Sequence, residues 1–196
     1  DPSSPYSASK GSADLIATSF NKTYGTEIKI LNLTNNYGPY QFPEKFIPTL
    51  ISYFLKNENA PIYGNGTNVR EWMYVYDSCN AIWKSVVSKN NFEKMNIGSG
   101  VRISNLEIAK TVFKIMKSQN LTNLKDNNFL KMVKDRPGHD KRYALNTNLF
   151  KKNINYKIKK NLYLGLTETV NWYIENNKWV KNVNKSYNFK RLGLID

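Results

Sequence analysis

The sequence predicts an α/β protein with parallel strand pairing in at least part of its sheet. Segments with a helical spacing of apolar residues alternate along the chain with short, apolar, strand-like runs. Turn-forming glycine, proline and asparagine residues separate the two kinds of segment. Such an alternation is typical of folds in which helices connect parallel strands.

The first quarter of the chain contains two predicted helices with a strand between them. A helix is expected over residues 5–24, because Leu15, Ile16 and Phe20 share one side and Gly25 suits the position after its end. The elements expected next are a strand over 27–34, a long loop over 35–45 (NNYGPYQFPEK) and a helix over 46–56.

The middle of the chain continues the alternation. Asp77 is expected to cap the N-terminus of a helix that starts with SCNAIW, in which Cys79 is expected to be a small buried residue. Ser104 and Glu107 have the spacing of a capping box for a helix from 105 to about 118. Around them we expect a turn-rich connection over 61–68 (PIYGNGTN) and strands over 70–75 and 94–100.

The last third of the chain contains fewer distinct signals. We expect a strand over 129–135, a polar loop over 136–144 (RPGHDKRYA), a helix over 166–180 and a loosely attached tail over 184–196. The sequence contains no internal repeat and no clear domain boundary.

Composition excludes several classes of protein. A hydrophobic fraction of 40% is sufficient for a core, and the single cysteine and single histidine argue against a disulfide framework or a zinc cluster. We therefore expect no bound metal. No apolar run is long enough to cross a bilayer, so we expect no membrane partner and a cytoplasmic location.

The net charge of +14 raises the question of a nucleic-acid partner. The lysines are scattered along the whole length among many asparagines, and no nucleic-acid-binding motif accompanies them. We interpret the charge as a solvated surface and expect no specific nucleic-acid partner. A basic nucleic-acid-binding module remains the alternative from a different class.

Tyr6 and Lys10 are the first residues that can carry chemistry. They are four apart in a predicted helix, so their side chains share one face. At about 4 Å, an ammonium group stabilises a tyrosinate by roughly 4 kcal/mol when the effective dielectric constant is near 20. A pair of this kind can transfer a proton to or from a sugar hydroxyl. By itself the spacing is common, so the pair needs support from the rest of the chain.

Three loops add groups that suit an anionic nucleotide ligand. Asn35 and Asn36 follow a predicted strand, where ligands bind in open α/β sheets, and their amides can bond ribose or sugar hydroxyls. Tyr63 can stack on a base, and Arg70 and Arg136 have the fork that suits a diphosphate.

Several stretches together resemble the C-terminal part of the dTDP-glucose 4,6-dehydratases, which are extended short-chain dehydrogenases/reductases. The matching stretches are PSSPYSASKG, NNYGPYQFPEKFIP, PIYGNGTNVREWMYV, NIGSG, DRPGHDKRYA and TVNWYIENNKWV. Tyr-x-x-x-Lys is common to the whole superfamily, whereas the second and fifth stretches are more specific. The resemblance implies an NAD(P)-binding Rossmann-like fold with a smaller substrate-binding domain.

The resemblance also implies roles for individual residues. Tyr6 would be the base that removes the C4 hydroxyl proton as hydride passes to NAD, Lys10 would hold the nicotinamide ribose, and Asn36 would lie near the cofactor. The implied contacts with the nucleotide sugar, dTDP-glucose, are Asn35, Lys45, Phe46, Pro61, Ile62, Tyr63, Arg70, Asn96, Asp135, Arg136, Pro137, Gly138 and His139. The implied reaction is a 4,6-dehydration that regenerates NAD in every turnover.

In the family, the glycine-rich phosphate turn and the Thr, Asp and Glu used for oxidation and dehydration precede the tyrosine. No such turn occurs in these 196 residues. We therefore expect a C-terminal fragment that is inactive alone and comes from a homodimeric parent. Its expected divisions are the end of the NAD-binding domain (1–40), a mostly substrate-binding part with some segments in the Rossmann sheet (41–183), and a tail (184–196).

Two further alternatives remain open at this point. Tyr6, Lys10 and Arg70 would equally serve a UDP- or GDP-sugar dehydratase, decarboxylase or epimerase of the same family. A non-catalytic remnant that acts only in oligomer contacts is the other, with the helix over 5–24 as its contact surface.

Overall fold

The computed structural model describes residues 2, 4–90, 92–135 and 138–186. The helices are α1 (Pro5–Tyr24), α2 (Phe46–Leu55), α3 (Val75–Val86), α4 (Asn105–Ser118), α5 (Asn148–Asn153), α6 (Leu162–Glu175) and α7 (Asn177–Ser186). The strands are β1 (Ile30–Leu33), β2 (Asn35–Tyr37), β3 (Ala60–Tyr63), β4 (Val69–Tyr74), β5 (Lys94–Ile97), β6 (Arg102–Ser104), β7 (Leu130–Val133) and β8 (Arg142–Tyr143). The α/β fold class is confirmed.

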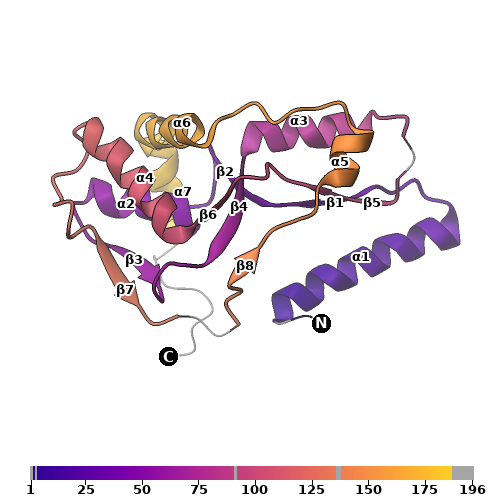
Figure 1. Ribbon diagram of the computed structural model, residues 1–196, viewed down its shortest axis with the longest axis horizontal. Coiled ribbons are helices and arrows are strands. Elements are labelled where there is room, and N and C mark those ends of the chain that lie inside the picture. Colours follow the sequence, from indigo (N-terminus) through magenta and orange to yellow (C-terminus); the bar gives the residue numbers. More distant parts are fainter. Residues whose placement is uncertain (1, 3, 91, 136–137, 187–196) are drawn as a thin grey trace.

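The strands form three small sheets. Strands β1 and β5 pair in parallel, as do β3 and β7. The third sheet is built on β4, which pairs in parallel with β2 and β8 and antiparallel with β6. The predicted parallel pairing is therefore confirmed, and Figure 1 shows the β3–β7 pair at one end of the molecule and the β1–β5 pair at the other.

Two hydrophobic clusters hold these elements together. The larger one lies where α2, α4 and α6 pack beside β3 and β4, with Leu50, Phe54 and Leu166 fully buried. The smaller one joins β5 to α3 and α5 through Met95 and Ile97, which face away from the polar side of their strand.

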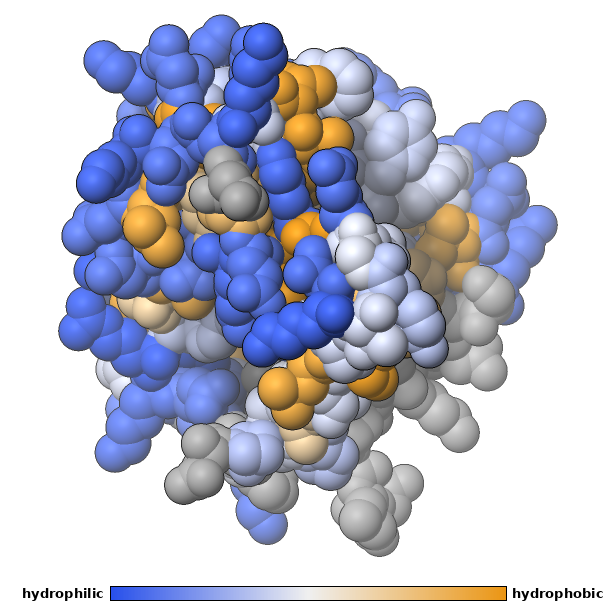
Figure 2. Space-filling model, turned by 90° about the vertical axis from the view of Figure 1, so that its right-hand side faces the viewer, coloured by the Kyte–Doolittle hydropathy of each residue, from blue (hydrophilic) through white to orange (hydrophobic). Residues whose placement is uncertain are grey.

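Helix α1 lies apart from both clusters. It has no buried residue, and its apolar side chains Leu15, Ile16 and Phe20 are exposed. Figure 1 shows α1 as a separate helix beside the β1–β5 pair. A contact between Asp14 and Lys94 links the helix to β5. Figure 2 shows the face that lies on the right-hand side of Figure 1. The surface of this face is largely hydrophilic, with separate hydrophobic areas.

Two local predictions, the end of α1 and the start of α4, are confirmed. Helix α1 ends at Gly25, whose backbone adopts φ 64° and donates to the carbonyl of Asn21. Ser104 and Glu107 form the expected capping box at the start of α4. No helix among the described residues is long and apolar enough to span a membrane.

Two residue predictions around α3 are wrong. The helix begins at Val75, directly after β4, so Tyr74 occupies the N-cap position and Asp77 lies within the first turn. The Asp77 carboxylate is buried and accepts bonds from a distant segment instead. Cys79 is exposed, because it lies on the outer side of α3 while Ser78 and Ala81 face inward.

The expected loops contain regular structure that the sequence patterns did not show. The segment over 61–68 starts within β3; Pro61 is tolerated there because this strand pairs with β7 alone. The loop over 35–45 begins with β2, and β8 lies inside the polar loop over 136–144. Strand β6 and helix α5 were also missed.

The late helix is interrupted. It begins at Leu162 and ends at Glu175, and Asn176 bonds the carbonyl of Trp172 with its side chain before α7 begins. An asparagine side chain that bonds the backbone competes with helix continuation, which explains the break. Of the expected tail, residues 184–186 belong to α7, and 187–196 lie outside the described residues.

Candidate active site

Tyr6 and Lys10 lie together on the exposed surface of α1. Ser4 and Ser7 form a capping box that fixes the start of the helix just before the pair. The Lys10 ammonium lies 5.8 Å from the centroid of the Tyr6 ring, and 72% of the Tyr6 surface is exposed. The pair can therefore meet a ligand that approaches this face of α1.

Asn35 and Asn36 extend from β2 beside the centre of β4. Their register partners are Trp72 and Met73. The side-chain oxygen of Asn36 accepts a bond from Ser78 at the start of α3, and its backbone carbonyl accepts one from Gln41 at 2.8 Å. The bond from Ser78 holds the side-chain amide of Asn36, and the bond from Gln41 holds its backbone.

The turn after β2 depends on a glycine. Gly38 has φ 139°, and a Cβ there would lie 2.7 Å from Cγ1 of Val75. The turn leads to Lys45, which is at the N-cap of α2. The Lys45 ammonium lies 2.6 Å from a carboxylate oxygen of Glu44. Phe46 stacks on Trp72 with ring centroids 6.3 Å apart. Phe46 therefore lies against the strand that carries Arg70, directly after Lys45 in the chain.

The parallel β3–β7 pair brings two predicted ligand-binding segments together. The Tyr63 ring meets the His139 ring edge to face, with centroids 6.2 Å apart. His139 Nδ1 lies 2.6 Å from a carboxylate oxygen of Asp135. Gly138 adopts φ 65° beside them, and Arg136 and Pro137 lie outside the described residues.

A cavity of about 410 Å³ opens beside this cluster. Its lining residues are Asn65, Thr67, Asn68, Asp135, His139 and Lys141. The first three and Lys141 were not predicted as site residues. The polar run GNGTN before β4 was the signal for them, since turn asparagines bond nearby backbone groups, as Asn65 does with Thr67.

Pro61, Ile62 and Tyr63 do not all face this cavity. Along β3, Pro61 and Tyr63 are partly exposed, whereas Ile62 is buried in the larger hydrophobic cluster. Successive side chains of a strand point to opposite faces, so a ligand on the Tyr63 side meets only the backbone of Ile62.

Arg70 is a residue of β4, and its side chain reaches the segment after His139. It is only 8% exposed, and its Nη2 donates to the carbonyl of Asp140 at 2.7 Å. Asn68 donates to the same carbonyl at 3.1 Å. Arg70 is thus close in the chain fold to the cavity that contains Asp135 and His139.

Asn96 lies on β5, in the sheet formed by β1 and β5. Its side chain accepts a bond from Asn32 at 3.4 Å and donates to the carbonyl of Asn146 at 3.2 Å. The structure therefore unites Tyr63, Arg70, Asp135 and His139 in one region. The Tyr6–Lys10 pair, by contrast, is on α1, which Figure 1 shows as a separate helix that does not pack on β3 or β7.

Comparisons with known proteins identify the family of the chain. A family model described as GDP-mannose 4,6 dehydratase matches residues 1–169. A probable dTDP-glucose 4,6-dehydratase of Sinorhizobium fredii is 40% identical over 199 residues, which cover 100% of this chain and 56% of that protein. The chain spans about half the length of the curated relatives it matches.

Solved structures show the same relationship. The crystal structure of a dTDP-glucose 4,6-dehydratase from Bacillus anthracis in complex with NAD is 37% identical, with a TM-score of 0.83 over 93% of this chain and 56% of that chain. A UDP-N-acetylglucosamine 4-epimerase from Methanobrevibacter ruminantium is 27% identical, with a TM-score of 0.78 over 90% of this chain and 55% of that chain. Since the family model covers more than half of its residues, the chain belongs to the GDP-mannose 4,6-dehydratase family, with the fold of the extended short-chain dehydrogenases/reductases.

Proposed function

We propose that the protein carrying this chain is a dTDP-glucose 4,6-dehydratase, which converts dTDP-glucose to its 4-keto-6-deoxy product and water. The observation that carries this proposal is the exposed Tyr6–Lys10 pair on α1, found in a chain 40% identical to a probable enzyme of this kind. The net reaction oxidises C4, removes water across C5 and C6, and returns the hydride to C6.

Tyr6 is proposed to remove the proton of the C4 hydroxyl, and Lys10 to hold the nicotinamide ribose of NAD. When bound, NAD supplies the acceptor and donor of the hydride. The Lys10 ammonium has room for this role, because α1 buries none of its residues against the rest of the described chain. The anchored amide of Asn36 is proposed to lie near the cofactor. These residues fit the nicotinamide end of the cofactor; no glycine-rich phosphate turn occurs in the 196 residues.

The nucleotide sugar is proposed to extend from the α1 pair toward the cavity beside β3. Tyr63 and the segment 135–139 would contact the base, and Arg70 the diphosphate. The sugar is proposed to contact Asn35, Lys45, Phe46 and Asn96. Most of these groups are uncharged or cationic at neutral pH, which suits an anionic ligand.

The complete activity is proposed for a protein longer than these residues, with 1–40 ending its NAD-binding domain, 41–183 mostly binding substrate and 184–196 forming a tail. The 196 residues alone are proposed to be inactive, because they lack the phosphate turn that holds a dinucleotide. The parent is proposed to be a homodimer in which the exposed apolar side of α1 contributes to the interface.

The experiment that tests the function replaces Tyr6 with phenylalanine in the protein carrying this chain. We expect Tyr6→Phe to lower kcat on dTDP-glucose by about 10²–10⁴-fold, because the proton acceptor is lost. Formation of the 4-keto product is measured by mass spectrometry. Tyr24→Phe is the matched control, since Tyr24 is on the same helix and is also 72% exposed. Equal activity in both variants would contradict the role of Tyr6.

A nucleotide-sugar epimerase, dehydratase or decarboxylase acting on a UDP- or GDP-sugar is the second candidate, favoured by the likeness to the 4-epimerase. Product analysis separates the two, because an epimerase returns a sugar with its C6 hydroxyl. A tenfold preference for UDP over dTDP, equal to about 1.4 kcal/mol, would also favour it. The net charge also suggests a test for nucleic-acid binding, in which DNA affinity is measured at several salt concentrations. A steep fall in affinity with rising salt is expected for a nucleic-acid-binding module.

A further inference from the structure

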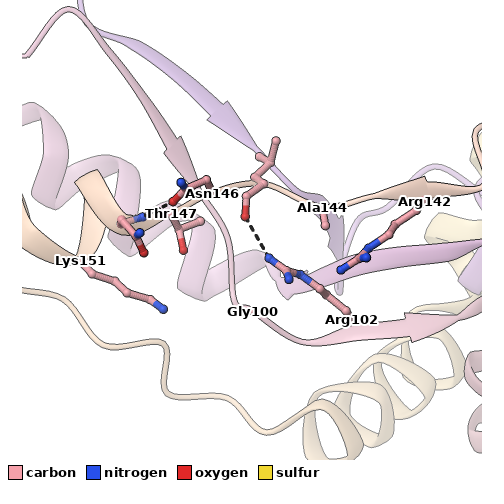
Figure 3. Close-up of a pocket in the computed structure, with 9 residues that line it drawn as sticks. Gly100, Arg102, Arg142, Ala144, Asn146, Thr147 and Lys151 are labelled. Carbon is pink, nitrogen blue, oxygen red and sulfur yellow. Dashed lines mark hydrogen bonds between the residues drawn. The ribbon is translucent and has the colours of Figure 1, made fainter.

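A second depression, of about 630 Å³, lies beside β6 and β8 and contains none of the residues assigned above (Figure 3). Its lining residues are Gly100, Arg102, Arg142, Ala144, Leu145, Asn146, Thr147, Asn148 and Lys151. The volume is within the range of small-molecule sites. Among the described residues that line it, three are cations and none is a carboxylate.

Strand register places this depression on the opposite face of β4 from Arg70. Arg102 pairs with Glu71, and Arg142 pairs with Val69. Paired residues point to the same face of a sheet, and Val69 and Glu71 share a face because they are two apart. Arg102 and Arg142 therefore share the Glu71 side, whereas Arg70 points to the other side.

The Arg102 guanidinium is held in position by contacts with Glu71 and Leu145. Its Nε lies 3.4 Å from the Glu71 carboxylate, which is fully buried, and its Nη2 donates to the carbonyl of Leu145 at 3.2 Å. The other Glu71 oxygen accepts from the Gly100 backbone at 2.8 Å. These contacts fix one edge of the guanidinium, so that a ligand need not order it.

Arg142 and Lys151 have no ion-pair partner within the part of the chain that the structure describes. Figure 3 shows the Arg142 guanidinium directed toward that of Arg102, with Lys151 at the other end of the depression. Three cations around one buried carboxylate leave an excess of two positive charges. The two guanidinium groups repel each other, because the single carboxylate beneath them balances only one positive charge, and a dianion removes that repulsion.

We propose that this depression binds the phosphate group of a small phosphate monoester. A phosphate dianion matches the excess charge, and its oxygens suit the fork of a guanidinium. Arg102 and Arg142 would bond the phosphate, while Lys151 and the polar segment over 146–148 would contact the remainder of the ligand. The proposal does not depend on the dehydratase function, because the site is on the other face of β4.

The test titrates inorganic phosphate and then glycerol 2-phosphate into the protein carrying this chain, by calorimetry at low ionic strength. We expect one saturable site and competition between the two ligands. Arg142→Gln should weaken the binding of both ligands about tenfold, since it removes one charge-assisted contact to the phosphate. Lys151→Gln should leave inorganic phosphate binding unchanged and weaken only the binding of glycerol 2-phosphate. Lys114→Gln, an exposed cation on α4, is the control and should change nothing. Circular dichroism melting verifies that the variants are folded.

Several results would overturn the proposal. They are the absence of saturable binding, an equal loss in Lys114→Gln, and failure of glycerol 2-phosphate to compete. Loss of phosphate binding in Arg70→Gln but not in Arg142→Gln would locate the anion on the opposite face. Binding of an oligonucleotide without binding of phosphate would indicate a nucleic-acid surface instead.

Discussion

At the scale of single residues, Asp77 is a buried carboxylate that joins two distant segments. It accepts a bond from the Tyr156 hydroxyl at 2.5 Å and from the backbone N–H groups of Lys159 and Lys160 at 3.2 and 2.9 Å. These bonds attach the segment before α6 to the first turn of α3. Burial raises the pKa of Tyr156 to about 12, and the bond to Asp77 adds to the shift.

Removal of the Asp77 carboxylate should destabilise the fold strongly. We expect Asp77→Ala to lower the free energy of unfolding by about 3 kcal/mol, because one hydroxyl and two N–H groups lose their acceptor. Urea unfolding followed by circular dichroism measures the change. Asp126→Ala, which removes an exposed carboxylate, is the control and should cost less than about 0.5 kcal/mol. Similar losses in both variants would contradict the assigned role.

The raised pKa of Tyr156 also predicts an alkaline limit of stability. A tyrosine whose pKa is higher in the folded state than in the unfolded state stabilises the fold fully below the unfolded value, near 10. That contribution is lost as the pH rises through the folded value of about 12. Tyr156→Phe should therefore flatten the fall in melting temperature between pH 10 and 12. An unchanged profile would count against the partly buried Tyr156–Asp77 contact.

At the scale of elements, the capping box of α4 links helix stability to pH. Glu107 accepts bonds from the Ser104 hydroxyl at 2.6 Å and the Ser104 backbone at 3.0 Å, and these bonds hold the pKa of Glu107 below its usual value. A lowered carboxyl pKa contributes stability above the unfolded value, and that contribution disappears as the pH falls through the folded value.

Ser104→Ala should therefore cost about 1 kcal/mol at neutral pH, the usual value of an N-cap. The difference from the unmodified protein should shrink as the pH falls through the lowered pKa of Glu107, where the carboxylate becomes protonated. Denaturant unfolding at several pH values measures it. Ser118→Ala, at the opposite end of α4, should show no such pH dependence; if it does, the effect does not come from the capping box.

At the scale of the whole molecule, stability is concentrated in the two hydrophobic clusters, and α1 lies outside both. An isolated helix of this length is marginal in water unless an apolar face is buried. Amide hydrogen exchange on the 196-residue chain should therefore show the α1 amides exchanging much faster than those of α4, which buries Val112 and Phe113. Equal protection would mean that α1 is covered by an interaction outside these contacts, such as a second copy of the chain.

The local signals in the sequence were good predictors wherever short-range chemistry decides. Gly25 ends α1 because a left-handed residue is required there, and Ser104 with Glu107 starts α4 because both partners are three residues apart. The strand at Pro61 and the role of Asp77 were not predictable in the same way. Each depends on a partner more than 65 residues away in the chain, β7 or Tyr156.

The sequence by itself determined the α/β class, the bounds of α1, α2 and α4 to within one residue, and the family, because periodicity, caps and extended motifs are local properties of the chain. Only the tertiary structure placed Tyr63 against His139 and put Arg102 and Arg142 on the face of β4 opposite Arg70. The physical reason is that strand register and pleat decide which side chains share a face, and register is set by contacts between segments far apart in the sequence.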